Sequence, residues 1–316
     1  MKRYCAGILT MVMVLSACVD VSNPQPATEK TIVIPIPETT TVISQTDSPP
    51  ETTTAETDET IELPFTGVTY TVPPPPIGRP EELQVLITPK AQEPLSVDYF
   101  DNCMFIGDSI ITGFNIWKST ILVDNTPLNN SYIFAVSSYS ANNAAQPISN
   151  NSYHPLYEGE QIRPEDIIRE IGVQRVFISL GLNDMYTQKE VFVANYTLLL
   201  SRIIEKNPDV EIIILSISPY LETAQPAPDR NAMIMEYNNE LIMLANRFGI
   251  AFIDSAAVLR EDNGGLKPEL CGDTPPVGMG CHWAPGTYAL VLQYILEHPP
   301  LTEEQKNEEY KIIIAE

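Results

Sequence analysis

The chain has 316 residues, of which 41 are acidic and 18 basic, so its formal net charge at pH 7 is −23. Such an acidic balance argues against nucleic acid or an anionic membrane face as a binding partner. Hydrophobic residues make up 44% of the chain, which is enough to build a sizeable core. We therefore expect a globular domain that binds neither nucleic acid nor an anionic membrane surface.

The first 17 residues have the pattern of a bacterial secretion signal. A basic start at Lys2 and Arg3 is followed by an apolar run over residues 6–15, which is too short to span a membrane. The motif LSAC at residues 15–18 resembles a lipobox, in which the cysteine is diacylated and becomes the mature N-terminus. The resemblance implies a lipoprotein held through lipidated Cys18 on the extracytoplasmic face of the cell membrane. A plain secreted protein with a coincidental cysteine is the alternative.

Residues 18–93 are predicted to be a disordered spacer. They are rich in Thr, Pro, Glu and Ser and include a run of prolines from Pro73 to Pro76. The segment has neither helical nor strand periodicity, and it has too little apolar surface to offset the entropy lost on folding. We expect it to extend the rest of the chain away from the membrane, with local stiffness from its prolines.

Residues 94–316 alternate between strand and helix patterns, which is typical of a single α/β domain. Because the strand-like runs are apolar throughout, we expect a parallel sheet that is covered on both faces. The prediction is a three-layer α/β/α sandwich. The expected strands are residues 103–106, 132–136, 175–180, 211–217 and 250–253, and the clearest expected helices are residues 164–171, 191–205, 231–248 and 284–297.

The motif Gly107-Asp108-Ser109 comes at the end of the first expected strand, directly before a helical pattern. A serine on such a turn lies at the carboxyl edge of the sheet, where open α/β folds bind their ligands. Its hydroxyl is exposed there, beside unpaired backbone N–H groups that can stabilise an anion. This position suits a nucleophile, and an ordinary helix-capping serine is the alternative.

A second polar motif, Gly181-Leu182-Asn183-Asp184, follows the third expected strand. The side-chain amide of Asn183 can point into a cleft at the sheet edge, where it would stabilise the oxyanion of an acyl-transfer intermediate. The alternative is a residue that only shapes the turn.

A serine nucleophile needs a base, because its hydroxyl is too weakly acidic to react unaided. The chain has three histidines. His154 lies in a polar loop and could line a substrate cleft, whereas the helix dipole accounts for His298 at the end of the last helix. His282 lies between the fifth strand and the last helix, where it can return over the end of the first strand. His282 is therefore the predicted base.

In their order and spacing, Gly107-Asp108-Ser109, residues 181–184 and His282 resemble blocks I, III and V of the SGNH (GDSL-type) hydrolases. The resemblance covers residues 100–299 and implies the SGNH hydrolase fold, with a flavodoxin-like parallel sheet of five strands. It implies ester hydrolysis or acyl transfer without a metal or another cofactor. Its assignments are Ser109 as nucleophile, Asn183 as oxyanion donor and His282 as general base, with the backbone N–H groups of Ser109 and Ser137 in the oxyanion hole.

Two positions depart from the family pattern. Block II normally supplies a glycine after the second strand, and Ser137 stands there in this chain, which retains a backbone N–H but not the looser turn of glycine. Block V normally has an aspartate three residues before the histidine, and that residue is Met279. Asp273, in the same loop, is our candidate for the acid that orients His282. A Ser–His dyad, with or without a backbone carbonyl as orienter, is the alternative.

Three cysteines lie beyond the signal and the lipobox. Cys103, at the start of the first strand, is predicted to be a small core residue. Cys271 and Cys281 bracket the loop before His282, and we predict a disulfide between them outside the cell. A metal site of Cys271, Cys281 and His282 is the alternative, but no further ligand is evident.

The sequence thus predicts a membrane-anchored serine esterase that removes an acyl group, O-acetyl in our interpretation, from a carbohydrate or cell-envelope polymer. O-acetyl transfer from the same site to a sugar hydroxyl is an alternative activity. The departures at Ser137 and Met279 also leave open a surface-binding protein on a degenerate SGNH fold. The oligomeric state stays open.

Overall fold

The computed structural model describes residues 60–62, 69–71, 88, 90–120, 127–224 and 227–301. The chain divides into two units, residues 1–54 and 55–316, and every described residue belongs to the second. The predicted signal, Cys18 and most of the predicted spacer lie outside the described residues. The spacer nevertheless contains two short strands, β1 (Thr60–Glu62) and β2 (Thr69–Thr71), which pair antiparallel. Within the described ranges, no helix is both long and apolar enough to cross a membrane.

A parallel sheet of five strands forms the centre of the second unit. Its strand order is β4-β3-β7-β8-β9, and each neighbouring pair is parallel. The whole of β3 is buried, as is the middle of β7, because helices cover both faces of the sheet. This confirms the predicted sheet. The strands are β3 (Cys103–Gly107), β4 (Tyr132–Ala135), β7 (Arg175–Ser179), β8 (Glu211–Leu215) and β9 (Ala251–Ile253).

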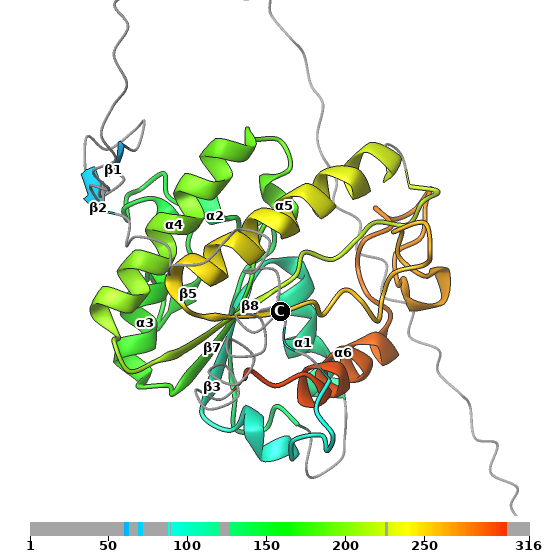
Figure 1. The fold of residues 1–316 in the computed structure, drawn as a ribbon, viewed down its shortest axis with the longest axis horizontal. Helices are drawn as coiled ribbons and strands as arrows, with labels where there is room; N and C mark the ends of the chain where they lie inside the picture. The colour runs from blue at the N-terminus through cyan, green and yellow to red at the C-terminus, as the bar shows by residue number, and fades with distance from the viewer. Residues whose placement is uncertain are drawn as a thin grey trace, which may run out of the picture. The chain divides into compact units, whose positions relative to one another are not determined.

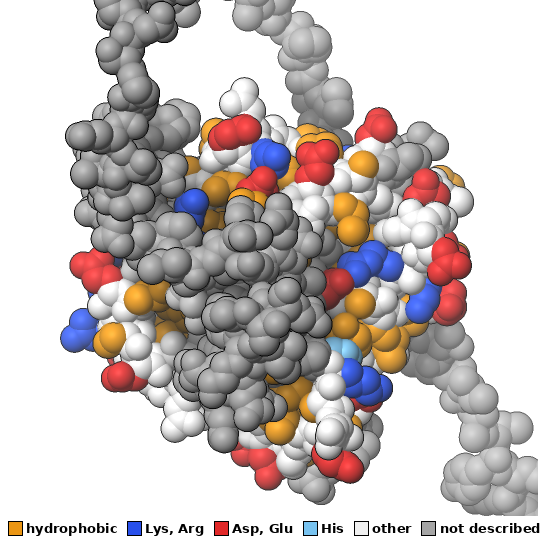
Figure 2. Space-filling model, viewed as in Figure 1, with side chains coloured by type: hydrophobic (Ala, Val, Ile, Leu, Met, Phe, Trp, Pro, Cys, Tyr) orange, Lys and Arg blue, Asp and Glu red, His pale blue; other side chains and the backbone are white. Residues whose placement is uncertain are grey.

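The helices form the two outer layers of the predicted sandwich. Figure 1 shows α1 and α6 on one side of the strands and α3, α4 and α5 on the other. Their bounds are α1 (Ser109–Thr120), α2 (Ala141–Ala145), α3 (Pro164–Ile171), α4 (Lys189–Lys206), α5 (Ala227–Phe248) and α6 (Pro285–Glu297). A small hairpin of β5 (Leu156–Tyr157) and β6 (Glu160–Gln161) precedes α3. Acidic side chains are spread over the visible face of the domain instead of forming one patch (Figure 2).

Aromatic rings hold β3, the strand that leads into Ser109, in the core. Phe105 on β3 stacks on Phe177 on β7, with 4.6 Å between the ring centroids, and contacts Phe114 of α1 at 5.2 Å. Cys103 is fully buried, as predicted, and its thiol donates to the backbone oxygen of Phe100 at 2.8 Å. Strand β3 and helix α1 are therefore fixed on both sides of the turn that joins them.

The chain joins the domain earlier than the predicted boundary at residue 94. The backbone N–H of Thr88 donates to Phe252 on the edge strand β9 at 3.3 Å. The N–H groups of Ala91 and Leu95 donate to the last two residues of α6, at 2.7 and 2.9 Å. An edge strand and the end of a helix both leave carbonyls unpaired, so a passing extended segment is held there whatever its side chains.

Candidate active site

Ser109 lies on a tight turn at the carboxyl edge of the sheet, where β3 passes into α1. A side chain at Gly107 would place its Cβ 2.2 Å from Ile111 and 2.7 Å from the backbone oxygen of Ser179, so only glycine fits here. The N–H of Ile110 donates to Asp108 Oδ1 at 2.9 Å, which closes the first turn of the helix. Ser109 is half-buried, and its hydroxyl faces the loop that precedes α6.

The structure brings together Ser109, His282 and Asp273. The Nε2 atom of His282 lies 2.9 Å from Ser109 Oγ, and its Nδ1 atom lies 2.6 Å from Asp273 Oδ2. With the Nδ1 proton directed to the carboxylate, Nε2 is free to accept the serine proton. The three side chains therefore have the hydrogen-bond order of a serine–histidine–acid unit, and an acid is present despite Met279.

Asp273 is held by the backbone of the same loop. Its Oδ1 accepts the N–H groups of Cys281 and His282, at 3.0 and 2.9 Å, and its Oδ2 accepts the N–H of Met279 at 3.0 Å. Burial alone would raise the pKa of Asp273, but the hydrogen bonds from the His282 ring and these N–H groups hold the pKa below its usual value. The carboxylate stays ionised, and Met279 contributes only its backbone.

Asn183 follows β7 on a short 3₁₀ turn, Leu182–Asp184, next to the turn that carries Ser109. Its Nδ2 donates to Asp108 Oδ2 at 2.9 Å and to the backbone oxygen of Tyr139 at 3.1 Å. To be stabilised by Asn183, a substrate oxyanion would have to replace Asp108 or the Tyr139 oxygen as acceptor of one of these two hydrogen bonds. Burial raises the pKa of Asp108 to about 7, while the N–H of Ile110 opposes the shift. Sequence reasoning did not assign Asp108 a contact, although its place in the motif beside Ser109 is a usable signal.

Ser137, the predicted second backbone donor of the oxyanion hole, lies in the turn after β4. The N–H of Tyr139 donates to the oxygen of Val136 at 3.1 Å, which closes a turn with Ser137 and Ser138 at its centre. The left-handed backbone that favours glycine is at Ser138, with φ 64°, one residue after Ser137, which stands at the position of the family's block II glycine. Ser137 is exposed, and its carbonyl accepts the hydroxyl of Tyr153 at 2.9 Å.

Asp184 joins the loop after β7 to the loop after β4, a contact that sequence reasoning missed. Its carboxylate is fully buried and accepts the N–H groups of Ala141 and Asn142, at 2.8 and 3.1 Å, in the first turn of α2. Burial raises the pKa of Asp184 to about 6, and the two N–H groups oppose this shift. The position of Asp184 beside Asn183 was its only signal.

The other two histidines lie outside the Ser109–His282–Asp273 arrangement. His154 does not line an open cleft, because it is buried with Nδ1 3.1 Å from the Tyr139 hydroxyl and Nε2 3.1 Å from the backbone oxygen of Gln146. Burial lowers the pKa of His154, which favours the neutral ring. His298 follows the last turn of α6, where Nδ1 lies 2.8 Å from the oxygen of Tyr294.

The predicted disulfide is absent, since Cys271 and Cys281 are both free thiols. The Sγ atom of Cys271 donates to Asp273 Oδ1 at 3.4 Å, and the loop is closed by the hydrogen bonds to that carboxylate instead of by a covalent bridge. Cys281 is buried, and burial raises the pKa of its thiol to about 12. Ligand atoms of Asp273, Cys281 and His282 lie within 4.8 Å of one another. A metal ion there would compete with the hydrogen bond between Asp273 and His282.

Three comparisons with known proteins were made, and one of them assigns a family. Residues 105–290 match the model of the GDSL-like lipase/acylhydrolase family. A search of curated proteins found no match. Among solved structures, the fold is similar to that of a Streptococcus pneumoniae protein, with 18% identity, 68% of this chain and 88% of that chain covered, and a TM-score of 0.44. It is also similar to the structure of Axe2, an acetylxylan esterase from Geobacillus stearothermophilus. The identity is 17%, 62% of this chain and 92% of that chain are covered, and the TM-score is 0.41.

The matched segment makes up more than half of the chain and contains Ser109, Asn183, Asp273 and His282. The order of these residues along the sequence is that of the SGNH blocks, and three of them share one hydrogen-bond chain. The resemblance stated from the sequence is thus confirmed. The protein belongs to the GDSL-like lipase/acylhydrolase family and is a hydrolase that acts on ester bonds.

Proposed function

We propose that this protein is a cell-surface serine esterase that removes an acyl group, O-acetyl in particular, from a carbohydrate or cell-envelope polymer. The observation that carries the proposal is the hydrogen-bond chain from Ser109 Oγ through His282 to Asp273. The extracytoplasmic setting is supported by the secretion signal, the lipobox at Cys18 and the long spacer, all of which are features of the sequence.

In the proposed reaction, Ser109 Oγ attacks the ester carbonyl while its proton passes to His282 Nε2. Asp273 holds the ring in the required tautomer and stabilises the imidazolium. The oxyanion of the tetrahedral intermediate would be stabilised by the Asn183 amide and the backbone N–H of Ser109 at the start of α1. The C–O bond to the sugar then breaks, and His282 returns the proton to the leaving hydroxyl. Water next attacks the acyl-serine with His282 again as base; the bond to Ser109 Oγ breaks, His282 returns the proton to Oγ, and the acid is released.

The test is hydrolysis of p-nitrophenyl acetate by the purified protein, together with labelling by a fluorophosphonate probe. We expect Ser109→Ala and His282→Ala each to remove most of the activity, and to a similar extent, because members of a catalytic unit are not additive. Ser119→Ala is the matched control, since Ser119 is an exposed serine on the same helix, α1. Equal rates for the wild type and Ser109→Ala would overturn the proposal.

A further inference from the structure

Two exposed tyrosines lie on loops that border the candidate active site. Tyr186 follows Asn183 in the loop after β7, and 81% of its surface is exposed. Tyr153 is 43% exposed, and its hydroxyl donates to the carbonyl of Ser137 in the turn after β4. Neither residue takes part in the hydrogen-bond chain of Ser109. Because both rings lie beside the turn of Ser109, they are placed to contact a ligand that extends beyond the reacting ester.

The sheet order places these two loops on opposite sides of the nucleophile. Strand β3, which leads into Ser109, lies between β4 and β7. Neighbouring strands in a sheet are about 4.8 Å apart, and all three strands end at the same edge because they are parallel. The turn that binds Tyr153 and the loop that carries Tyr186 therefore flank the turn of Ser109.

The ring of Tyr186 is fixed although it is exposed. The Nη2 atom of Arg230 donates to the Tyr186 hydroxyl at 2.6 Å, and the guanidinium lies 5.6 Å from the centre of the Tyr186 ring. Arg230 in turn lies over the buried ring of Tyr220, at 4.9 Å. A ring held in this way loses little conformational freedom when a ligand binds, which is how a binding platform gains affinity.

Sugar rings match these surfaces. One face of a pyranose presents C–H groups that pack against an aromatic ring, while its hydroxyls remain free at the rim to meet water and the polar edge of tyrosine. A small ester that reaches Ser109 has no part that could contact rings on both sides of it. A chain of sugars that crosses the sheet edge is long enough to contact both rings.

We propose that Tyr153 and Tyr186 are sugar-binding platforms on either side of Ser109, and that the substrate is an acylated polysaccharide lying across the carboxyl ends of β4, β3 and β7. This inference rests on the proposed function and specifies its substrate as a polymer. It assigns the two tyrosines to binding, while the chemistry stays with Ser109, His282 and Asp273.

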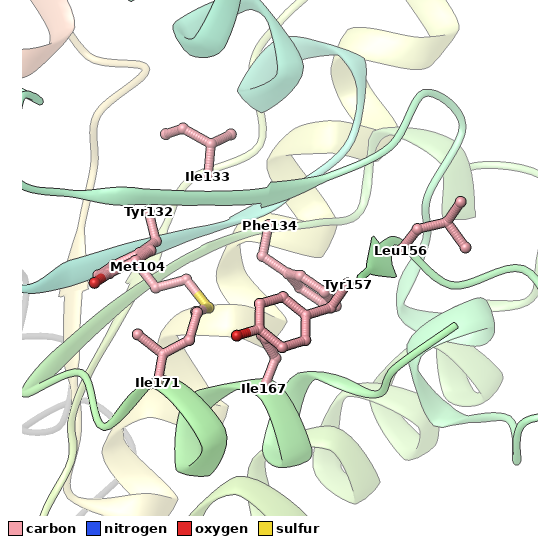
Figure 3. A pocket seen from close by; sticks show the side chains of 8 residues that line it. All are labelled: Met104, Tyr132, Ile133, Phe134, Leu156, Tyr157, Ile167 and Ile171. Atoms are coloured by element: carbon pink, nitrogen blue, oxygen red, sulfur yellow. The ribbon is translucent and has the colours of Figure 1, made fainter. Parts of the chain in front are cut away.

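The structure supplies a matched control at the opposite end of β4. Tyr132, the first residue of β4, is also 43% exposed. It lines an open pocket of about 360 Å³ formed by residues of β3, β4, β5 and α3 (Figure 3). Tyr132→Ala thus removes an equally exposed tyrosine that lies at the amino edge of the sheet, away from Ser109.

The experiment compares kcat and KM of the full-length protein on p-nitrophenyl acetate and on chemically acetylated xylan and glucomannan. For Tyr153→Ala and Tyr186→Ala we expect kcat/KM on the polymers to fall about 3- to 10-fold each, mainly through KM, as for the loss of one aromatic contact. Activity of Tyr186→Ala on p-nitrophenyl acetate should stay within twofold of wild type, whereas Tyr153→Ala also removes the hydrogen bond to the Ser137 carbonyl and is judged by its KM on the polymers. Tyr186→Phe, which retains the ring face, should restore most of the activity on the polymers. Tyr132→Ala should leave the activity on both kinds of substrate unchanged.

The remaining outcomes separate the two proposals. If wild type cleaves p-nitrophenyl acetate but neither the polymers nor acetylated monosaccharides, the carbohydrate substrate of the proposed function is wrong. The inference that Tyr153 and Tyr186 bind sugars is then wrong as well. If wild type deacetylates the polymers and both alanine variants match it, only the platforms are wrong. A loss confined to long-chain p-nitrophenyl esters would assign the rings to an acyl chain and would also overturn the inference.

Discussion

At the residue scale, the carboxylate of Asp273 combines two tasks. It accepts three backbone N–H groups of its own loop and also the Nδ1 proton of His282. The same group therefore folds the loop and orients the proposed base. This explains how an acid nine residues before the histidine replaces the one that the family pattern places at Met279. The contacts favour the triad over the Ser–His dyad, which the sequence left open.

Replacing Asp273 with asparagine should lower kcat on p-nitrophenyl acetate by at least about 10²-fold, with 10⁴-fold as the upper range seen in full triads. The amide loses the negative charge that stabilises the imidazolium and directs an N–H group at either the ring or the backbone. Kinetics combined with a thermal melt would check this. Asp262→Asn, at an exposed position of the preceding loop, is the control. A nearly silent Asp273→Asn in a folded protein would establish the dyad.

Asn183→Ala should lower kcat by about 10²–10³-fold with little change in KM, as for the loss of one oxyanion donor. The variant also leaves Asp108 Oδ2 and the oxygen of Tyr139 without their amide partner, so a small fall in melting temperature is expected. Steady-state kinetics and a thermal melt report the two effects separately. A large loss of stability with normal turnover in the folded fraction would make Asn183 a structural turn residue.

At the element scale, Asp184 links the loop after β7 to the first turn of α2 through two hydrogen bonds. Its pKa rises from 3.8 in the unfolded chain to about 6 in the fold. Between these values the unfolded chain has lost the proton and the folded protein retains it. The free energy of unfolding therefore falls as pH rises from about 4 to about 6 and levels off above, by up to about 3 kcal/mol for this group.

Asp184→Asn should remove this pH-dependent part. Urea unfolding at pH 4 and pH 7 would give the free-energy gap between wild type and variant, and we expect the gap to be larger at pH 4. Asp108, which titrates in the same direction, is present in both proteins and cancels in the comparison. An equal gap at both pH values would contradict the assignment.

The parallel strands and the long helices were predictable because each is a continuous local pattern of apolar residues. Contacts made by backbone groups were not. Asp273 accepts three N–H groups in place of the expected Cys271–Cys281 bridge, and no side-chain pattern announces such bonds. His154 looked like a cleft residue because its neighbours in the sequence are polar, yet its partners Tyr139 and Gln146 bury it. Ser109 and His282 were predictable, since strand order alone brings them to one edge.

At the scale of the whole molecule, the proposed anchor is testable apart from the chemistry. Cys18→Ser removes the atom that would be acylated, so in the native host the protein should move from the detergent phase to the aqueous phase in Triton X-114 partitioning. Its activity on p-nitrophenyl acetate should stay unchanged, because Cys18 lies far along the chain from the site. Wild type and variant both in the aqueous phase would show that the protein is secreted without an anchor.

The segment at residues 88–95 sets the direction in which a tethered enzyme would work. Ala91 and Leu95 bond to the last turn of α6, whereas α6 begins three residues after His282. Thirteen residues of helix at 1.5 Å each put roughly 20 Å between these two ends. The segment at residues 88–95 and the candidate active site thus lie at opposite ends of α6. With the proposed anchor at Cys18, the candidate active site would lie at the end of α6 that points away from the segment leading to the membrane.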